Sequence, residues 1–302
     1  MPRIAVIINH QAGSTGEIGT TQIEDALRAA GFESSVTLAS DGSKIVDAAK
    51  QALSEGADIV VAGGGDGTVS AVASELVGSG IALGVLPLGT LNHFAKDIGI
   101  PMEPDQALQT IVAGHRMAVD VAEVNGKFFL NNSSIGIYPD IVKYRETQQR
   151  RFGKSKWTAF FWACMNAMRR HPFLDVQLKA DGENLTRHTP FVFVGNNEYS
   201  IDGFDIGERK TLSAGTLSLY VSQRTGRIGL LGFAVRALFG RLRQARDFDA
   251  VLSEEVVIRT RIERMRVSTD GEVAMMETPL NYRIRAGALT VLVPAIAESP
   301  PA

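Results

Sequence analysis

The first third of the chain alternates short apolar runs with segments of helical spacing. The apolar runs are rich in β-branched residues, as buried strands are, and the segments between them repeat apolar residues at three- and four-residue intervals. Strands that alternate with helices in this way predict βαβ units, a parallel sheet, and ligands at the carboxyl ends of the strands. The predicted strands are Ile4–Ile8, Ser35–Leu38, Asp58–Ala62 and Ile81–Leu86, and the predicted helices are Thr21–Ala30, Lys44–Ser54, Val69–Val77 and Asn92–Ile98.

The pattern changes at about Val119, where short alternating segments separated by turn residues begin. Such segments predict an antiparallel β domain, with hairpins at Asn125-Gly126, Asp181-Gly182 and Asp270-Gly271. Two segments of helical character interrupt it, Trp157–Arg170 and Ile228–Gln244. We therefore predict an α/β domain over residues 1–118 and a β domain over residues 119–302. The last apolar run, Leu289–Val293, is expected to pack back on one of the two.

Composition narrows the class of protein. A chain of 302 residues suits two domains of ordinary size. With 45% hydrophobic residues, 21% charged residues and a net charge of −2, it reads as globular and has no general attraction to nucleic acid. The lone Cys164 excludes an intrachain disulfide and favours a reducing compartment, with the cytoplasm as the expected location. No secretion signal or apolar run of 18 residues is evident, so neither export nor a membrane span is expected.

The sharpest chemical signal is the run from Gly63 to Thr68, which reads Gly-Gly-Gly-Asp-Gly-Thr and lies between a predicted strand and a predicted helix. Glycines at such a junction let a ligand approach the backbone, and the N–H groups at the start of a helix favour an anion such as phosphate. Thr68 is a candidate cap for that helix. The run lacks the Gly-Lys-Ser/Thr of a Walker loop, and its acid lies inside the loop. Asp66 beside phosphates therefore suggests an intervening Mg²⁺ or hydroxyl group. A glycine-rich turn with no ligand is the alternative.

A second loop, Pro87–Asn92, leaves the next predicted strand in the same way. The pair of loops resembles the catalytic domain of the diacylglycerol kinase family, which includes sphingosine, ceramide and bacterial lipid kinases. That family carries a G-G-D-G-T loop and, some twenty residues later, P-x-G-T-x-N-x-(F)-A, and this chain has Gly64–Thr68 and Pro87–Ala95. The likeness extends to Asn9 with Gly13, although His10 replaces the family's proline, and to Asp270-Gly271-Glu272.

The resemblance implies an N-terminal nucleotide-binding domain, a C-terminal β-sandwich that takes the lipid, and an active site in the cleft between them. It also implies ATP as the phosphoryl donor and a catalytic Mg²⁺. The residues that it assigns to ATP binding are Asn9, Thr37, Gly64, Gly65, Asp66, Gly67, Thr68 and Thr90.

The turn Asp270-Gly271 has two compatible readings. From the residues alone it is a type I′ hairpin turn between two strands. The resemblance adds that Glu272 is the general base for the lipid hydroxyl, with Asp270 beside it, and Asp66 is the next candidate. A rigid turn suits a carboxylate that must accept a proton near Mg²⁺-bound phosphates.

The chain departs from the family at two positions. Bacterial members usually carry an Asp-Gly-x-Leu turn that holds a structural Mg²⁺, but the corresponding stretch here has Ala214, which cannot ligate a metal. A structural Mg²⁺ is therefore not expected there, and the ligands of the catalytic Mg²⁺ are a separate question that the sequence leaves unassigned. His93 replaces a common aspartate and is expected to be a helix cap or a surface contact.

Two basic and aromatic segments, Arg145–Arg170 and Ile228–Arg246, are candidates for contact with an anionic membrane surface. A core of aromatic residues with a solvated charged face is the alternative for each. With a lipid substrate, the first reading makes the protein a cytoplasmic enzyme that attaches peripherally to membranes. The acceptor lipid and the oligomeric state are not indicated by the sequence.

Two other functions remain open. NAD kinases share the G-G-D-G-T loop, although their characteristic second Asn-Glu loop is not evident and Pro87–Asn92 favours lipid kinases. A non-catalytic nucleotide- or lipid-binding relative is the other alternative.

Overall fold

The computed structural model describes residues 1–12, 19–136, 174–180, 183–203, 205–209, 211–222, 242–243 and 248–295. The chain forms two units, of which the first comprises residues 1–121 and 286–302 and the second residues 122–285. The boundary expected at residues 118 and 119 falls inside a strand, β5, Arg116–Val124. Both β5 and the last strand, β19, Leu280–Leu292, contribute residues to each unit.

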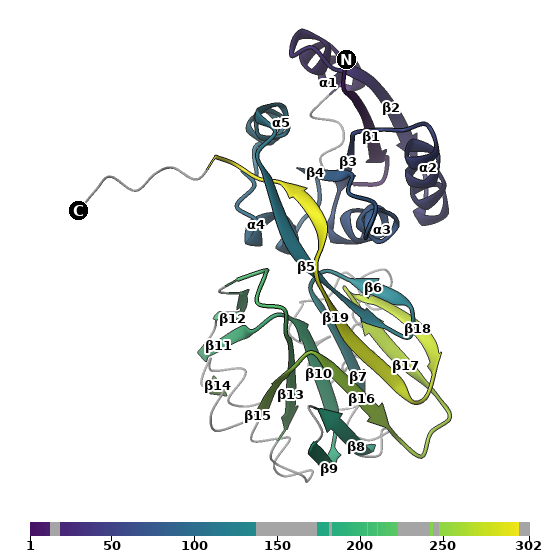
Figure 1. The fold of residues 1–302 in the computed structure, drawn as a ribbon, viewed down its shortest axis with the longest axis vertical. Coiled ribbons are helices and arrows are strands. Elements are labelled where there is room, and N and C mark those ends of the chain that lie inside the picture. Colours follow the sequence, from purple (N-terminus) through teal and green to yellow (C-terminus); the bar gives the residue numbers. More distant parts are fainter. Residues whose placement is uncertain are drawn as a thin grey trace, which may run out of the picture. The chain divides into compact units, whose positions relative to one another are not determined.

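The first unit is the predicted α/β domain (Figure 1). Its parallel strands run in the order β2-β1-β3-β4, and the end of β19 pairs in parallel with β4 through Thr290 and Ala82. The strands are β1 Arg3–Asn9, β2 Glu33–Ala39, β3 Ile59–Gly64 and β4 Ala82–Pro87. The helices are α1 Thr20–Ala29, α2 Gly42–Ser54, α3 Asp66–Leu76, α4 His93–Asp97 and α5 Pro104–Ala113.

Sequence pattern explains these elements. Every residue of β3 and β4 is buried, which is why both strands read as continuous apolar runs. Helix α1 buries Ile23 and Leu27, one turn apart, on the sheet side. Asp41 caps α2 by accepting a hydrogen bond from the Lys44 N–H at 3.1 Å. Hydrogen bonds from the Ser43 hydroxyl, the Lys44 N–H and the Ser40 hydroxyl lower the pKa of the Asp41 carboxyl to about 2.

The second unit is the predicted antiparallel β domain. One sheet has the strand order β15-β13-β10-β7-β17-β18. In the other the start of β19 pairs with β16, β16 with β8, and β8 with β9. Side chains of both sheets, such as Val194, Leu219, Ile258 and Tyr282, share one apolar core, as in a β-sandwich. A small sheet joins β11, β12 and β14.

The strands of the second unit have the following bounds. They are β6 Lys127–Phe129, β7 Asn132–Gly136, β8 Leu174–Ala180, β9 Glu183–Thr189, β10 Phe191–Asn196, β11 Tyr199–Gly203, β12 Asp205–Arg209, β13 Leu217–Ser222, β14 Leu242–Arg243, β15 Phe248–Ser253, β16 Glu255–Arg259, β17 Arg264–Thr269 and β18 Glu272–Glu277.

Two of the predicted hairpin turns are confirmed. Asn125 and Gly126 have φ angles of 46° and 86°, and Asp270 and Gly271 have φ angles of 48° and 85°, the positive pairs that a type I′ turn requires. The turn predicted at Asp181-Gly182 lies outside the described residues. The predicted helix Trp157–Arg170 and most of the predicted helix Ile228–Gln244 also lie outside them. Within the second of these, Leu242–Arg243 are described, and they form strand β14 and not helix.

An ionic cluster joins β5 to β19 within the second unit. Glu123, whose side chain is 9% exposed, accepts hydrogen bonds from Arg283 Nε and Nη2, both at 3.0 Å, and from Arg285 Nε at 2.9 Å. Burial alone would raise the pKa of the Glu123 carboxyl, but the two guanidinium groups outweigh it and hold that pKa below its ordinary value.

Replacing this carboxylate is expected to destabilise the protein. Glu123→Gln removes the charge and turns an amide donor toward arginine donors, so the free energy of unfolding should fall by about 2 kcal/mol at neutral pH, the scale of hydrogen bonds to charged groups. Because the folded-state pKa is lowered, the carboxylate stabilises the fold above its unfolded-state pKa. This contribution is lost as the pH falls through the folded-state value. Urea denaturation of both proteins across the acidic range measures it.

Asp25→Asn is the control, because Asp25 pairs with Arg28 at 3.1 Å on the surface, where ion pairs contribute little. Equal losses from the two substitutions, or a loss from Glu123→Gln that is independent of pH, would contradict the assignment.

Candidate functional site

The first glycine loop leaves β3 at Gly64 and leads directly into α3. Helix α3 begins at Asp66, three residues earlier than predicted, and its N-cap is Gly65 in extended conformation, with φ −89° and ψ −176°. The Gly65 carbonyl accepts hydrogen bonds from the N–H groups of Thr68 at 2.9 Å and Val69 at 3.1 Å. Thr68 is therefore inside the helix, and the expectation that it caps the helix is wrong. The missing side chain at Gly65 leaves the helix start accessible.

The second loop lies against the first. A Cβ atom added to Gly89 would overlap the Cα atom of Gly65, and the Leu88 N–H donates to the Gly64 carbonyl at 3.1 Å. Asn92 holds the second loop in shape: its Oδ1 atom accepts from the Gly89 N–H at 3.1 Å and its Nδ2 atom donates to the Gly89 carbonyl at 2.8 Å. At position 89 only glycine fits this approach of two backbones.

Asp66 links the two loops through its side chain. Its Oδ1 atom accepts a hydrogen bond from the Phe94 N–H at 3.1 Å, in the first turn of α4. The acid inside the glycine loop thus has one oxygen engaged with the helix that follows the second loop. Half-buried Asp66 is in a position to orient α4 as well as to present a carboxylate.

The remaining predicted site residues of the first unit follow the same strand ends. Asn9, the last residue of β1, donates from Nδ2 to Thr68 Oγ1 at 3.2 Å and so ties β1 to the first loop. Thr90 is exposed in the second loop. Thr37 is exposed on β2, opposite Ile7, two residues before the strand ends. His93 is the exposed first residue of α4, consistent with a surface position.

The predicted residues of the second unit lie on the β17–β18 hairpin. The carboxylate of Asp270 accepts hydrogen bonds from three consecutive backbone N–H groups, those of Leu130 at 2.8 Å, Asn131 at 2.8 Å and Asn132 at 3.1 Å. Its own N–H donates to the Asn132 carbonyl at 2.9 Å. Glu272, the exposed first residue of β18, pairs with Lys127 at 3.3 Å. The two acids therefore have different surroundings.

Sequence reasoning missed a polar cluster beside this hairpin. Arg209 donates to the Leu130 carbonyl at 2.7 Å and to Asn131 Oδ1 at 3.0 Å, and its guanidinium lies 5.5 Å from the centre of the Tyr199 ring. Asn196 Nδ2 donates to the same Leu130 carbonyl at 2.8 Å. These residues come from separate strands and loops, and the only local signal was the polar pair Asn131-Asn132 at the start of β7.

The stretch in which a structural Mg²⁺ would be expected does not suit one. Asn197 Oδ1 accepts a hydrogen bond from the Ala214 N–H at 2.9 Å, and the Asn197 N–H donates to the Thr216 carbonyl at 3.0 Å. An amide side chain thus holds this turn, and Ala214 supplies no ligand. Within the part of the chain that the structure describes, no group of three or more His, Cys, Asp or Glu side chains is arranged to hold a metal ion.

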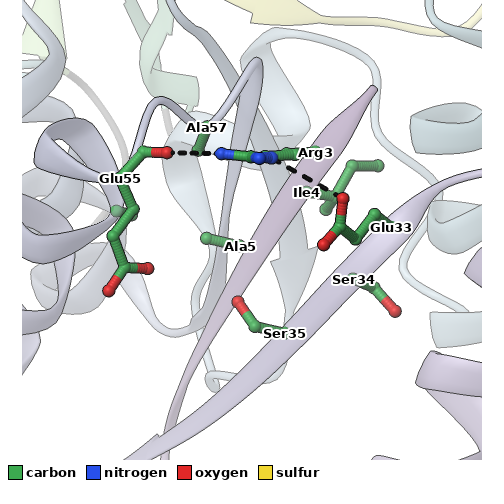
Figure 2. Close-up of a pocket in the computed structure, with 9 residues that line it drawn as sticks. Arg3, Ile4, Ala5, Glu33, Ser34, Ser35, Glu55 and Ala57 are labelled. Carbon is green, nitrogen blue, oxygen red and sulfur yellow. Dashed lines mark hydrogen bonds and ion pairs between the residues drawn. The ribbon is translucent and has the colours of Figure 1, made fainter. Parts of the chain in front are cut away.

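A hollow in the first unit lies at the amino-terminal ends of β1 and β2, away from the glycine loops (Figure 2). Arg3 lies in it and is already engaged, with Nε 3.6 Å from Glu33 and Nη1 donating to the Glu55 carbonyl at 2.9 Å. Two glutamates beside one paired arginine give no phosphate site, so this hollow is not the predicted nucleotide site.

Some predicted features lie outside the described residues. These are Gly13, Arg145–Arg170 and nearly all of Ile228–Arg246. Among the helices that are described, none has the length and apolarity needed to cross a bilayer.

Comparison with known proteins gives the same picture over most of the chain. Residues 3–124 match the diacylglycerol kinase catalytic domain, and residues 135–293, more than half of the chain, match the YegS C-terminal NAD kinase beta sandwich-like domain. A diacylglycerol kinase of Bacillus subtilis is 25% identical over 282 residues, 91% of each chain. A probable lipid kinase YegS-like of Citrobacter koseri is 44% identical over 100 residues, but this match spans only 32% of each chain.

Solved structures agree with the sequence comparisons. The crystal structure of a putative diacylglycerol kinase from Bacillus anthracis matches with a TM-score of 0.75 and 25% identity, over 96% of each chain. The α/β fold with paired glycine loops, the antiparallel β domain and these matches together place the chain in the diacylglycerol kinase catalytic-domain family, with a C-terminal domain of the YegS type.

Proposed function

We propose that this protein transfers the γ-phosphoryl group of ATP to a hydroxyl group of diacylglycerol or a related lipid. The observation that carries the proposal is the backbone contact of Gly65 with Gly89, which places two glycine loops side by side at the ends of β3 and β4. Family membership supplies the reaction class, and the Bacillus subtilis relative carries the name diacylglycerol kinase.

The glycine loops are suited to the phosphates of ATP. The first N–H groups of α3 have no partners within the helix, and the partial positive charge at a helix start favours an anion. Gly65 and Gly67 carry no side chain to keep phosphate oxygens away from these groups. Asn9, Thr37, Thr68 and Thr90 are the proposed side-chain contacts to ATP.

Asp66 fits a Mg²⁺ ion that also binds phosphate oxygens. Its Oδ1 atom is engaged with the Phe94 N–H, and Mg²⁺ commonly takes one or two carboxylates together with phosphates and water. The ion would neutralise negative charge on the transferring group. The role of the protein is to hold this carboxylate rigidly between α3 and α4.

Glu272 is the proposed general base. The lipid hydroxyl oxygen attacks the γ-phosphorus as its proton passes to the Glu272 carboxylate. The bond from the γ-phosphorus to the bridging oxygen breaks, and ADP leaves. Exposed Glu272, paired with Lys127, is accessible to a substrate. Asp66 is the alternative base.

A lipid-panel assay tests the function. Labelled ATP is supplied with diacylglycerol, phosphatidylglycerol, a sphingoid base or ceramide in vesicles with and without anionic lipid, and with NAD in a parallel reaction. We expect label in one lipid, more of it on anionic vesicles, and a decrease as salt screens the contact with the bilayer. Label in NAD alone would instead identify an NAD kinase-like enzyme. ATP binding without any labelled product would identify a non-catalytic relative.

The first glycine loop can be tested by adding one methyl group. In Gly65→Ala the new Cβ lies 3.4 Å from the Gly89 Cα, an ordinary contact, so the fold should survive. The methyl group would nevertheless stand between α3 and the phosphates, and we expect the Kd for Mg-ATP in calorimetric titration to rise at least roughly tenfold.

Gly42→Ala is the matched control, because a Cβ at Gly42 meets nothing within 4 Å and the residue begins α2. Its Kd should equal that of the wild type. A folded Gly65→Ala protein with unchanged ATP affinity would remove the loop from the site.

The general base can be tested with Glu272→Gln. Glutamine keeps the length and the hydrogen-bonding capacity of the side chain but does not accept the proton, so kcat should fall by about a hundredfold or more while ATP binding persists. Glu277→Gln, at the other exposed end of β18, is the control and should leave kcat within about twofold, as expected for a surface residue outside the site. Near-normal turnover by Glu272→Gln would move the search to Asp66.

A further inference from the structure

Two acids flank Gly271 at the tip of the β17–β18 hairpin, and they differ in what holds them. The carboxylate of Asp270 already accepts three backbone hydrogen bonds of 2.8, 2.8 and 3.1 Å from residues 130–132. Its Oδ1 atom serves two of these N–H groups and its Oδ2 atom the third. Charge-assisted bonds of this length are strong, and three of them to consecutive backbone groups fix the position of the Asp270 carboxylate.

The N–H groups that Asp270 holds belong to segment 130–132, which follows β6 and ends at the first residue of β7. The same segment is also bound by Arg209 and Asn196, which both donate to the Leu130 carbonyl, at 2.7 and 2.8 Å. Segment 130–132 is thus held through its N–H groups and through its carbonyl groups. All six of its backbone N–H and carbonyl groups are paired, as buried polar groups require.

This segment is continuous with the strand that reaches Glu272. Lys127, the first residue of β6, lies three positions before Leu130, and its Nζ atom is 3.3 Å from Glu272 Oε2. Glu272 in turn lies two positions after Asp270, across a turn with positive φ angles. Asp270, segment 130–132, Lys127 and Glu272 therefore form a closed ring of covalent and hydrogen-bonded links.

We propose that Asp270 is a positioning residue, which clamps segment 130–132 to the hairpin and so holds Lys127 and the Glu272 carboxylate in one arrangement. It neither ligates a metal nor takes the substrate proton. The inference rests on the proposed function, because it assigns Asp270 a part in the action of Glu272. An exposed ion pair such as Lys127–Glu272 contributes little stability alone, so the clamp and not the pair must fix the geometry.

Asp270→Asn tests the clamp directly. The amide turns one donor toward backbone N–H groups and removes the negative charge that they face, so amide hydrogen exchange at residues 130–132 should become at least tenfold faster. Exchange in β10 and β13 should stay unchanged, which shows that the unit remains folded. Asp58→Asn is the matched control, because Asp58 accepts a hydrogen bond from the Arg3 N–H at 2.8 Å in the first unit. It should alter neither exchange at 130–132 nor kcat.

A double-mutant cycle tests the functional part. We expect Asp270→Asn to lower kcat at least tenfold, with the Mg²⁺ concentration for half-maximal activity unchanged within twofold. In the Glu272→Gln background the same substitution should lower kcat less than twofold, because its effect passes through Glu272. A tenfold increase in the Mg²⁺ requirement would make Asp270 a metal ligand and overturn the proposal. Equal losses of kcat in both backgrounds would mean that Asp270 only supports the fold in general, which overturns the proposal. No loss of kcat in Asp270→Asn would overturn the proposal too.

Two further results keep the inference separate from the proposed function. If Asp270→Asn does not fold, Lys127→Met tests the other end of the ring. Its kcat should fall at least threefold in the wild-type background and not in Glu272→Gln, and an equal or absent fall overturns the proposal. If the wild type phosphorylates no lipid, or Glu272→Gln keeps its turnover, the proposed function or its base is wrong. Exchange at residues 130–132 then still decides whether Asp270 is a clamp.

Discussion

The approach of Gly65 to Gly89 is the constraint on which the candidate nucleotide site depends. Two backbones meet there with no room for a Cβ atom on Gly89, so the loops after β3 and β4 act as one surface. Asp66 and Asn92 make this contact rigid, the first through the Phe94 N–H and the second through both polar groups of Gly89. A site for phosphates then needs no large cavity, because its donors are backbone groups held in place by two side chains.

The candidate acids of the second unit are held in place by side-chain hydrogen bonds to the backbone. Its candidate acids lie on a two-residue hairpin, which would be a mobile place for chemistry if nothing else held it. Three N–H groups on one carboxylate join this hairpin to the segment after β6, and Arg209 and Asn196 hold the same segment through the Leu130 carbonyl. Polar networks of this kind are stabilising only when every member is satisfied, and a single substitution in one is correspondingly costly.

Much of this organisation was predictable because its signals are local. Continuous apolar runs identified β3 and β4, the motif Gly64–Thr68 identified the first loop, and Asn125-Gly126 and Asp270-Gly271 identified hairpin turns, since each depends on neighbouring residues alone. Where a signal was ambiguous the prediction failed. Threonine is a common helix cap, yet Gly65 and not Thr68 is the N-cap of α3, because the Gly65 carbonyl accepts the first helical hydrogen bonds. The bonds of Asp270 with residues 130–132 span well over a hundred positions, and no single-sequence pattern encodes such a pair.

The pairing of β19 with β4 bears on how the protein is made. Thr290 lies beside Ala82 in the parallel sheet, 208 positions later in the chain. A ribosome that has completed the glycine loops and α5 must still add the whole second unit before the strand that pairs with β4 emerges. The first unit therefore cannot finish folding during synthesis as an independent N-terminal domain would. The edge of β4 stays open as a target for chaperones, or for pairing with other nascent chains, until the last strand arrives.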